Sequence, residues 1–237
     1  IHSRDGQVTI TGSEIRLSSA FTGGAIFSDK RGGGFGPGFV TLIDSRITNS
    51  QANSGGAIHG NGDDLTITGS ELSFNMTFNG DGGAIENVGG DLQITESLIE
   101  NNQIGGTSTR GGAIATSGPG SALTITDSMI SNNNGGIGDG GGLFSDSIGS
   151  ITGSTISGNF ADSGGGLRND GMLTIQNSTI SGNMTTGGQP YGGGIYGRTG
   201  STTTIESSTI TNNTGYGGGI YAGDSTTLNL KNTIIAG

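Results

Sequence analysis

The sequence predicts an all-β protein, a right-handed parallel β-helix, and three observations point to this fold. A short apolar step is followed five residues later by a second apolar step, and this pair occurs nine times. A third step, introduced by glycines, follows most pairs after a loop of variable length. The copies recur every 24–32 residues, which is the length of one turn of a wide solenoid rather than of one hairpin.

Each step is interpreted as one short strand because apolar and polar residues alternate in it. Leu65 and Ile67, for example, point to one side of their strand, and Thr66 and Thr68 point to the other. The first steps centre on Ile10, Leu42, Ile67, Ile94, Ile125, Ile151, Ile175, Ile205 and Leu230. The second steps centre on Ile15, Ile47, Leu72, Ile99, Ile130, Ile156, Ile180, Ile210 and Ile235. The third steps centre on Ile26, Ile58, Ile85, Ile114, Leu143, Leu167, Ile195 and Ile220.

Identical steps favour the stacking of each strand on its own copies, which gives three parallel sheets with a rise of about 4.8 Å per coil. About nine coils of this length, with loops of mixed size, are typical of the right-handed form; thin left-handed solenoids keep a tighter spacing. A single coil cannot be stable, because ordering its backbone costs about 1–2 kcal/mol per residue. Stacked coils bury continuous aliphatic columns, and each buried side chain contributes about 1.5–3 kcal/mol.

Composition and charge exclude several classes of function. The 237 residues include 52 glycines, no cysteine and no tryptophan, and the net charge is −10. An acidic surface repels nucleic acid and anionic membranes, because phosphate binding requires lysine and arginine. No apolar run approaches the roughly 20 residues of a membrane-spanning helix. We therefore expect no nucleic-acid partner, no membrane insertion, no disulfide framework and no thiolate metal site.

A polar column accompanies the apolar ones. Asparagine stands three residues after the second centre in six consecutive coils, and serine (Ser18, Ser50) stands there in the two coils before them. Stacked amides can bond to one another from coil to coil, and a buried amide without a partner costs about 1–3 kcal/mol. The spacing therefore predicts a structural asparagine ladder made of Asn75, Asn102, Asn133, Asn159, Asn183 and Asn213.

The glycines before the third step are predicted to be corner residues. Glycine tolerates a positive φ and a close approach of neighbouring backbone, and a corner of a coil requires one or the other. The predicted corner glycines are Gly23, Gly55, Gly82, Gly111, Gly141, Gly165, Gly193 and Gly218.

The repeated Gly-Gly-Ala-Ile step, paired with a tetrapeptide that ends in asparagine such as Ile156-Ser157-Gly158-Asn159, resembles the repeats of the chlamydial polymorphic membrane proteins. It is also similar to the wider group of bacterial right-handed β-helix surface proteins and autotransporter passengers. In the chlamydial repeat the tetrapeptide begins with phenylalanine, whereas here it begins with isoleucine or leucine. The resemblance covers nearly the whole chain and implies a secreted or surface-displayed, adhesin-like protein.

The acidic residues and histidines do not form a catalytic or metal-binding pattern in the sequence. Asp63 and Asp64 are the only adjacent acidic pair in the sequence, and we interpret them as a solvated turn rather than a catalytic or calcium-binding pair. Asp139 and Asp170 lie beside glycine-rich corners and are the alternative ligands for Ca²⁺. His59 follows a third step at an outward, variable position. We expect no catalytic residue, no metal site and no cofactor, with Ca²⁺ as the one alternative.

Two surface patterns leave further alternatives open. Thr-x-Thr ranks such as Thr66/Thr68 and Thr124/Thr126 are typical of ice-binding solenoids, although charged and larger residues interrupt them in other coils. Exposed aromatic residues are candidate contacts for sugars or partner chains, and Tyr196 with Tyr221 is expected to form a short stack. These aromatic residues are Phe35, Phe39, Tyr191, Tyr196, Tyr216 and Tyr221.

The sequence thus predicts one parallel β-helix domain over residues 1–237, as a fragment or protomer of a longer assembly. Its expected function is that of a non-enzymatic, extracellular structural or adhesive element, a surface stalk or a self-associating fibre subunit. A polysaccharide-active lyase or hydrolase and an ice-binding protein are the alternatives. The expected location is secreted or at the bacterial cell surface. The expected partners are further copies stacked end to end, a longer parent chain, or a carbohydrate or other cell-surface ligand.

Overall fold

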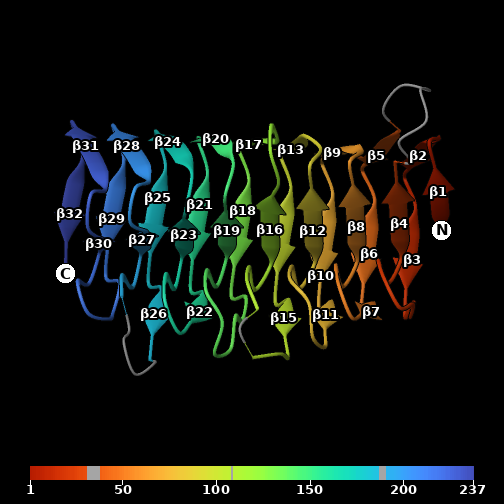
Figure 1. Cartoon of the computed structure of the whole chain (residues 1–237), viewed down its shortest axis with the longest axis horizontal. Coiled ribbons are helices and arrows are strands. Elements are labelled where there is room, and N and C mark those ends of the chain that lie inside the picture. Colours follow the sequence, from red (N-terminus) through yellow and green to blue (C-terminus); the bar gives the residue numbers. More distant parts are fainter. Residues whose placement is uncertain (31–37, 108, 187–190) are drawn as a thin grey trace.

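The computed structural model describes residues 1–30, 38–107, 109–186 and 191–237, and in these residues the chain is a parallel β-solenoid. The described part contains 32 strands, and none of its segments is a helix long and apolar enough to cross a lipid bilayer. Coil follows coil along one axis, with the two termini at opposite ends (Figure 1). The predicted fold class, with its three main parallel sheets, is confirmed.

Sheet A contains the strands of the third step, with apolar centres that point into the solenoid. It also includes a first strand, at the N-terminus, that the sequence pattern did not identify. In the described residues its nine strands are β1 (His2–Arg4), β4 (Ile26–Asp29), β8 (Ile58–Asn61), β12 (Ile85–Val88), β16 (Ile114–Ser117), β19 (Leu143–Ser145), β23 (Leu167–Asn169), β27 (Ile195–Gly197) and β30 (Ile220–Ala222).

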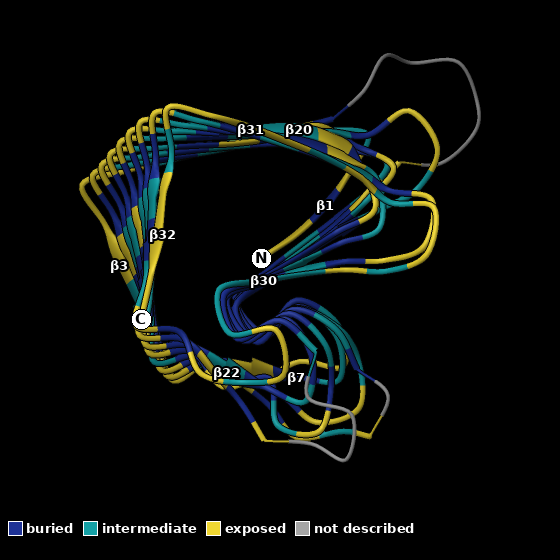
Figure 2. Ribbon diagram, turned by 90° about the vertical axis from the view of Figure 1, so that its left-hand side faces the viewer, coloured by how far each residue is buried: buried dark blue, intermediate teal, exposed yellow. Residues whose placement is uncertain are grey.

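Sheet B contains the strands of the first step and is the longest face of each coil (Figure 2). Its register places like on like: Leu92 pairs with Leu65 on one side and with Leu123 on the other. In the described residues its strands are β2 (Gln7–Thr11), β5 (Phe39–Ile43), β9 (Asp64–Thr68), β13 (Leu92–Thr95), β17 (Ala122–Thr126), β20 (Ile148–Thr152), β24 (Met172–Gln176), β28 (Thr202–Glu206) and β31 (Thr227–Lys231).

Sheet C contains the three-residue strands of the second step: β3 (Glu14–Arg16), β6 (Arg46–Thr48), β10 (Glu71–Ser73), β14 (Leu98–Glu100), β18 (Met129–Ser131), β21 (Thr155–Ser157), β25 (Thr179–Ser181), β29 (Thr209–Thr211) and β32 (Ile234–Ala236). Two-residue strands follow some of them and form two small additional sheets. These are β7 (Gln51–Ala52), β11 (Met76–Thr77) and β15 (Gln103–Ile104), and then β22 (Phe160–Ala161) and β26 (Met184–Thr185).

The core is the space that sheets A, B and C enclose (Figure 2). At least one aliphatic side chain from each sheet fills it in every interior coil, as Ile85, Ile94 and Ile99 do, each with no exposed surface. Sheet B supplies a second one in several coils, such as Leu92. Since each of these side chains contributes about 1.5–3 kcal/mol on burial, the repeated columns offset the entropy of ordering a chain so rich in glycine. The core therefore depends on the register between coils.

Sharp corners at both ends of sheet C result from single residues in the left-handed conformation. Between sheets B and C the corner residue changes identity from coil to coil, yet its φ stays between 46° and 62°. These residues are Gly12, Asp44, Gly69, Glu96, Asp127, Gly153, Asn177, Ser207 and Asn232. Several of them carry side chains that rarely adopt this conformation, so the stacked coils must impose it.

The predicted corner glycines fall into two groups. Gly23, Gly55, Gly82, Gly111 and Gly218 have a positive φ. In the later coils the left-handed residue is one position earlier than predicted, at Gly140, Gly164 and Gly192. The residues named in the prediction, Gly141, Gly165 and Gly193, are those at which an added Cβ would lie 2.3–2.6 Å from a carbonyl oxygen of the next coil. Two consecutive glycines are required because one turns the chain and the other admits the neighbouring backbone.

Candidate functional site

The structure brings the six predicted asparagines together in one column at the end of sheet C. All six side chains are at most 6% exposed. The Nδ2 of Asn102 donates to the Oδ1 of Asn133 at 3.0 Å and to the carbonyl oxygen of Leu72 at 2.9 Å. The Oδ1 of Asn133 also accepts the backbone N–H of Asn102 at 2.9 Å. The same contacts recur between Asn75 and Asn102 and between Asn133 and Asn159, so this asparagine column binds each coil to the next.

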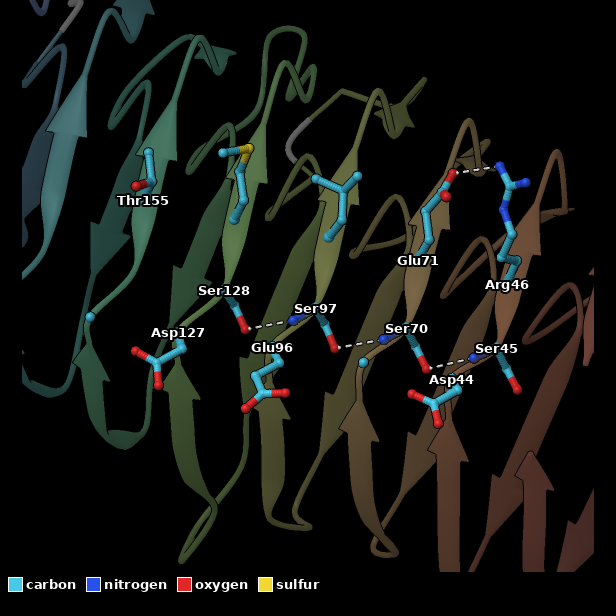
Figure 3. A pocket seen from close by; sticks show the side chains of 14 residues that line it. Asp44, Ser45, Arg46, Ser70, Glu71, Glu96, Ser97, Asp127, Ser128 and Thr155 are labelled. Atoms are coloured by element: carbon cyan, nitrogen blue, oxygen red, sulfur yellow. Dashed lines mark hydrogen bonds and ion pairs between the residues drawn. The ribbon is translucent and has the colours of Figure 1, made fainter. Parts of the chain in front are cut away.

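A second polar column, formed by serines at the corner between sheets B and C, is absent from the sequence predictions. Each hydroxyl donates to the carbonyl oxygen two residues earlier, at 2.7–2.9 Å. Each hydroxyl after the first also accepts the backbone N–H of the serine in the preceding coil, at 3.0–3.1 Å. Figure 3 shows four of its members. The column consists of Ser13, Ser45, Ser70, Ser97, Ser128, Ser154, Ser178 and Ser208. The signal was available, because a serine precedes the second centre by two residues in eight coils and a threonine does so in the ninth.

Beside the serine column runs an open groove of about 640 Å³ on the outer surface (Figure 3). Carboxylates of Asp44, Glu96 and Asp127 border it on the corner side. On the other side Arg46 forms an ion pair with Glu71 at 2.9 Å. Burial tends to raise the pKa of Glu71, but the hydrogen bond from Ser73 and the guanidinium of Arg46 lower it overall. The one cationic side chain of this groove is thus already paired.

The interpretation of Asp63 as part of a solvated turn is wrong. Asp63 is completely buried, and it accepts hydrogen bonds from the Ser28 hydroxyl at 2.6 Å and from the Gly38 backbone N–H at 2.9 Å. Its partner in the predicted pair, Asp64, is half-buried and accepts the N–H of Asp91. Asp63 precedes β9 and is buried, whereas Asp64 begins β9 and is partly exposed, so the two carboxylates have separate surroundings and separate partners.

The outward face of sheet A brings Asp139 and Asp170 together, although they are 31 residues apart in the chain. Arg168 on β23 forms ion pairs with both: its Nη1 contacts Asp139, and its Nε and Nη2 donate to Asp170 at 2.7 and 2.9 Å. Arg198 donates to the same Asp170 at 3.1 Å. The guanidinium of Arg168 also lies over the ring of Phe144, with its Cζ 5.6 Å from the ring centroid. We call Asp139, Arg168, Asp170 and Arg198 the arginine–aspartate cluster.

Burial sets the direction of the pKa shift of Asp139 in this cluster, whereas ion pairing sets that of Arg168. Burial raises the pKa of the Asp139 carboxyl above its ordinary value of 3.8, despite the opposing charge of Arg168. For Arg168, burial alone would lower the pKa, but the hydrogen bonds to Asp170 and the charge of Asp139 outweigh it and raise the pKa. Burial thus favours the protonated form of Asp139, and the charge of Arg168 opposes it.

A similar pair stands two coils earlier. Arg110 contacts Asp81 at 2.6 Å and lies over the other side of Phe144, with Cζ 4.5 Å from the ring centroid. Burial again raises the pKa of Asp81. Next to it on the same face, His59 lies 3.0 Å from Glu86, and its side chain is 14% exposed. The outward placement predicted for His59 is correct, but the side chain is packed rather than free on the surface.

All four tyrosines of the chain gather beside the arginine–aspartate cluster. Tyr196 and Tyr221 extend outward from β27 and β30, with ring centroids 5.7 Å apart. Tyr191 stacks on Tyr221 at 4.3 Å, and Tyr216 meets both at about 6 Å. Arg168 joins the two groups, because its Cζ is 5.5 Å from the Tyr196 ring. The sequence placed Tyr196 and Tyr221 in successive coils, but it did not indicate that the two loop tyrosines join them.

The remaining candidates are dispersed. In the described residues no three side chains of His, Cys, Asp or Glu converge in a way that could hold a metal ion. Phe39 lies on the outer face of sheet B, away from the tyrosines, and Phe35 lies outside the described residues. On that same face one register column runs Thr68, Thr95, Thr126, Thr152 and is then continued by Gln176, Glu206 and Lys231.

Comparisons with known proteins agree with the architecture. The family model described as the right-handed β-helix region matches residues 56–237. A search of curated proteins and a search of solved structures found no match. The matched segment covers more than half of the chain, and its coils are those whose stacking is described above. The chain therefore belongs to the right-handed β-helix family.

Proposed function

We propose that this chain is a non-enzymatic, extracellular structural and adhesive element, secreted or displayed at a bacterial cell surface. The resemblance of its repeats to those of bacterial surface proteins supports the extracellular location. The acidic net charge of −10 and the lack of cysteine are compatible with it. In this role the solenoid holds a binding face at a distance from the cell surface, and the stiffness of the solenoid matters more than any single reactive group.

The single observation that supports this proposal best is the continuity of the asparagine and serine columns. Every coil from Ser45 to Ser208 is connected to its neighbour by a hydroxyl, and every coil from Asn75 to Asn213 by an amide. Two rows of buried hydrogen bonds flank the short strands of sheet C and resist bending between coils. A rod with this reinforcement suits a stalk or a fibre.

Self-association is the second part of the proposal. Each strand pairs in parallel with the same strand of the neighbouring coil, as Ile205 does with Ile175 and with Leu230. A stack built by one repeated pairing can in principle be extended by a further layer of like strands. We propose that a second copy or further coils of a parent chain supply that layer.

Electron microscopy across a dilution series tests the proposal. We expect stiff rods at low concentration and filaments at high concentration, with an axial repeat of about 43 Å for nine coils. Isolated particles of constant length at all concentrations would contradict the proposal that the chain forms a fibre. Flexible or globular particles would also contradict the proposal that the chain is a stiff stalk.

The second candidate function is a polysaccharide-cleaving enzyme, and the arginine–aspartate cluster favours it. Asp139 and Asp170 lie on one guanidinium, and the raised pKa of Asp139 suits a proton donor. Against this role, Asp170 accepts hydrogen bonds from two arginines and its side chain is only 9% exposed. Release of reducing ends from a neutral or acidic polysaccharide, abolished in Asp139→Asn, would favour the enzyme over the scaffold.

A further inference from the structure

We propose that a sodium ion binds inside the solenoid, between the side chains of Asp63 and Asn87. We call this place the interior cation site, and the hydroxyl of Ser28 is its third oxygen ligand. Asn87 lies on β12 of sheet A, and Asp63 directly precedes β9 of sheet B. The site is independent of the proposed adhesive function, because it lies inside the solenoid.

The carboxylate of Asp63 is completely buried and forms no ion pair with a cationic side chain among the described residues. In this part of the chain its hydrogen bonds come from neutral donors, the Ser28 hydroxyl at 2.6 Å and the Gly38 backbone N–H at 2.9 Å. Burial of a negative charge is costly unless a positive charge lies close to it. The described surroundings of Asp63 thus supply hydrogen-bond donors but no balancing charge.

The side-chain oxygen of Asn87 is a second, independent observation. Asn87 is completely buried, and its Nδ2 donates to the carbonyl oxygen of Gly90 at 2.6 Å. Its Oδ1 has no hydrogen-bond partner among the described residues, a condition that it shares there only with the hydroxyl of Ser201. Because buried acceptors are almost always satisfied by a donor, a water molecule or an ion, this oxygen indicates a bound partner.

The Asn87 oxygen faces the coil that contains Asp63. On the inner side of sheet A, Asn87 pairs in register with Gly60 of the preceding coil, and Gly60 pairs with Ser28 of the coil before that. A Cβ at Gly60 would lie 2.6 Å from the Oδ1 of Asn87, so this oxygen lies directly over the glycine. Asp63 follows Gly60 by three residues, and its carboxylate contacts Ser28 on the other side of the glycine. Gly60 therefore leaves room for oxygen atoms from both neighbouring coils.

The chemistry of these side chains favours a small monovalent cation. A carboxylate, an amide and a hydroxyl all present oxygen, which is the ligand that hard cations prefer. The Ser28 hydroxyl can donate its proton to Asp63 and still offer a lone pair to the ion. One carboxylate balances one positive charge, whereas Ca²⁺ sites use roughly six to eight oxygens and commonly several carboxylates. In the described residues no three acidic side chains converge in that way.

A second asparagine of the same register column shows what the protein alone can satisfy. Asn169 lies three coils after Asn87 in this column and is also completely buried. Its Oδ1 accepts the backbone N–H of Gly171 at 3.0 Å, and its Nδ2 donates to Thr202 and Thr203 at 2.9 Å. Asn169 is therefore the matched control for Asn87, with the same side chain and burial but a satisfied oxygen.

Thermal unfolding of the whole chain, followed by circular dichroism, tests for the ion. We would compare NaCl with choline chloride at equal ionic strength, so that the net charge of −10 is screened equally in both. An ion that binds only the folded state stabilises it in proportion to the logarithm of its excess over the dissociation constant. NaCl should therefore raise the melting temperature above that in choline chloride, by at least about 5 °C at a hundredfold excess over Kd.

Four variants locate the ion. The difference in melting temperature between the two salts should disappear in Asp63→Asn and in Asn87→Ala. It should persist in Asn169→Ala and in Asp64→Asn, which removes the neighbouring, partly exposed carboxylate. Each variant is compared with itself in the two salts, so a general loss of stability does not affect the result.

A crystal structure of the wild-type chain grown in NaCl places the ion directly and requires no variant. The expected density lies between Asn87 Oδ1 and an Asp63 oxygen, closer to both than the roughly 2.7–2.8 Å of a hydrogen bond between oxygens. Equal melting temperatures in the two salts would overturn the proposal, as would a sodium response that survives in Asp63→Asn. Density at hydrogen-bond distance would also overturn it, because a water molecule would then be the partner of Asn87. None of these results bears on rod or filament formation, which electron microscopy tests separately.

Discussion

Replacement of Asn133 by alanine tests the asparagine column at its centre. The side chain of Asn133 accepts two hydrogen bonds from Asn102 and donates two, to Ile99 and Asn159. Two of the partners keep another bond: the Asn102 amide still donates to Leu72, and the Asn159 oxygen still accepts the backbone N–H of Asn133. The backbone N–H of Asn102 loses its acceptor in a site without exposed surface.

The expected loss of stability follows from these contacts. An unsatisfied buried N–H costs about 1–3 kcal/mol, and each of the other lost hydrogen bonds contributes about 0.5–1.5 kcal/mol. We therefore expect Asn133→Ala to lower the free energy of unfolding by about 3–5 kcal/mol. Asn213→Ala, at the end of the column where the side chain is 6% exposed, should have a smaller effect because water can reach the vacated groups.

Urea unfolding followed by circular dichroism measures the global effect, and hydrogen exchange of the Asn102 amide measures the local one. The matched control is Asn134→Ala, the adjacent residue, whose exposed side chain accepts one hydrogen bond from the Gly136 N–H. This control should change stability by less than about 1 kcal/mol. Equal stability of the Asn133 and Asn134 variants, with unchanged exchange at Asn102, would refute the reasoning.

Three further changes test other contacts. Ser97→Ala removes the acceptor of the Ser70 N–H at 3.1 Å and should cost about 1–3 kcal/mol in urea unfolding. Gly83→Ala places a Cβ 2.0 Å from the carbonyl oxygen of Gly112 and should cost about 3 kcal/mol or more, visible as a lower melting temperature. The raised pKa of Asp139 means that the folded state binds the carboxyl proton more tightly than the unfolded state does. Protonated Asp139 therefore makes its full contribution to stability below pH 3.8, and this contribution is lost as the pH rises through the raised pKa. In Asp139→Asn the free energy of unfolding should therefore decrease less steeply with rising pH just above pH 3.8 than in the wild type.

Each of these changes has a control in the same chain. Ser201 is 2% exposed and its hydroxyl has no partner among the described residues, so Ser201→Ala should be nearly neutral. Gly105→Ala meets its nearest atom only at 3.3 Å and should be tolerated better than Gly83→Ala. Asp44→Asn, on an exposed corner, is the control for the loss of one surface carboxylate. If a control matches its test variant, the contact named for that variant does not explain the effect.

The fold was predictable because its determinants are local and periodic. The five-residue offset between the first and second strands sets the register, and alternation within each strand assigns residues such as Ile94 to the core. A short-range pattern repeated nine times averages out the errors of any one copy. The positions of the asparagines in a column followed from the same regularity.

The features of the site were less predictable because they depend on contacts across coils and on loops of unequal length. Asp139 precedes its glycine corner and Asp170 follows its strand, so their common partner Arg168 cannot be found from spacing alone. Tyr191 follows a loop whose length no pattern fixes. The polarity of Asp63 predicts a solvated turn, whereas in the folded chain the Ser28 hydroxyl and the Gly38 N–H donate to its buried carboxylate. Periodicity predicts columns, and only the folded chain shows which loops meet them.

The corner between sheets B and C has a consequence for how such a chain can change. From the first centre to the second the step is five residues in all nine copies. The left-handed residue of the corner lies within it, as does the serine, which is replaced by Thr233 in the last copy. From the asparagine column to the next left-handed glycine the distance varies, from four residues (Asn213 to Gly217) to nine (Asn183 to Gly192). The segment that joins sheets B and C thus has the same length in every coil, and differences in coil length are accommodated in the loops that follow sheet C. Loop segments can be inserted, shortened or exchanged on that side while the strands of the neighbouring coils keep their register.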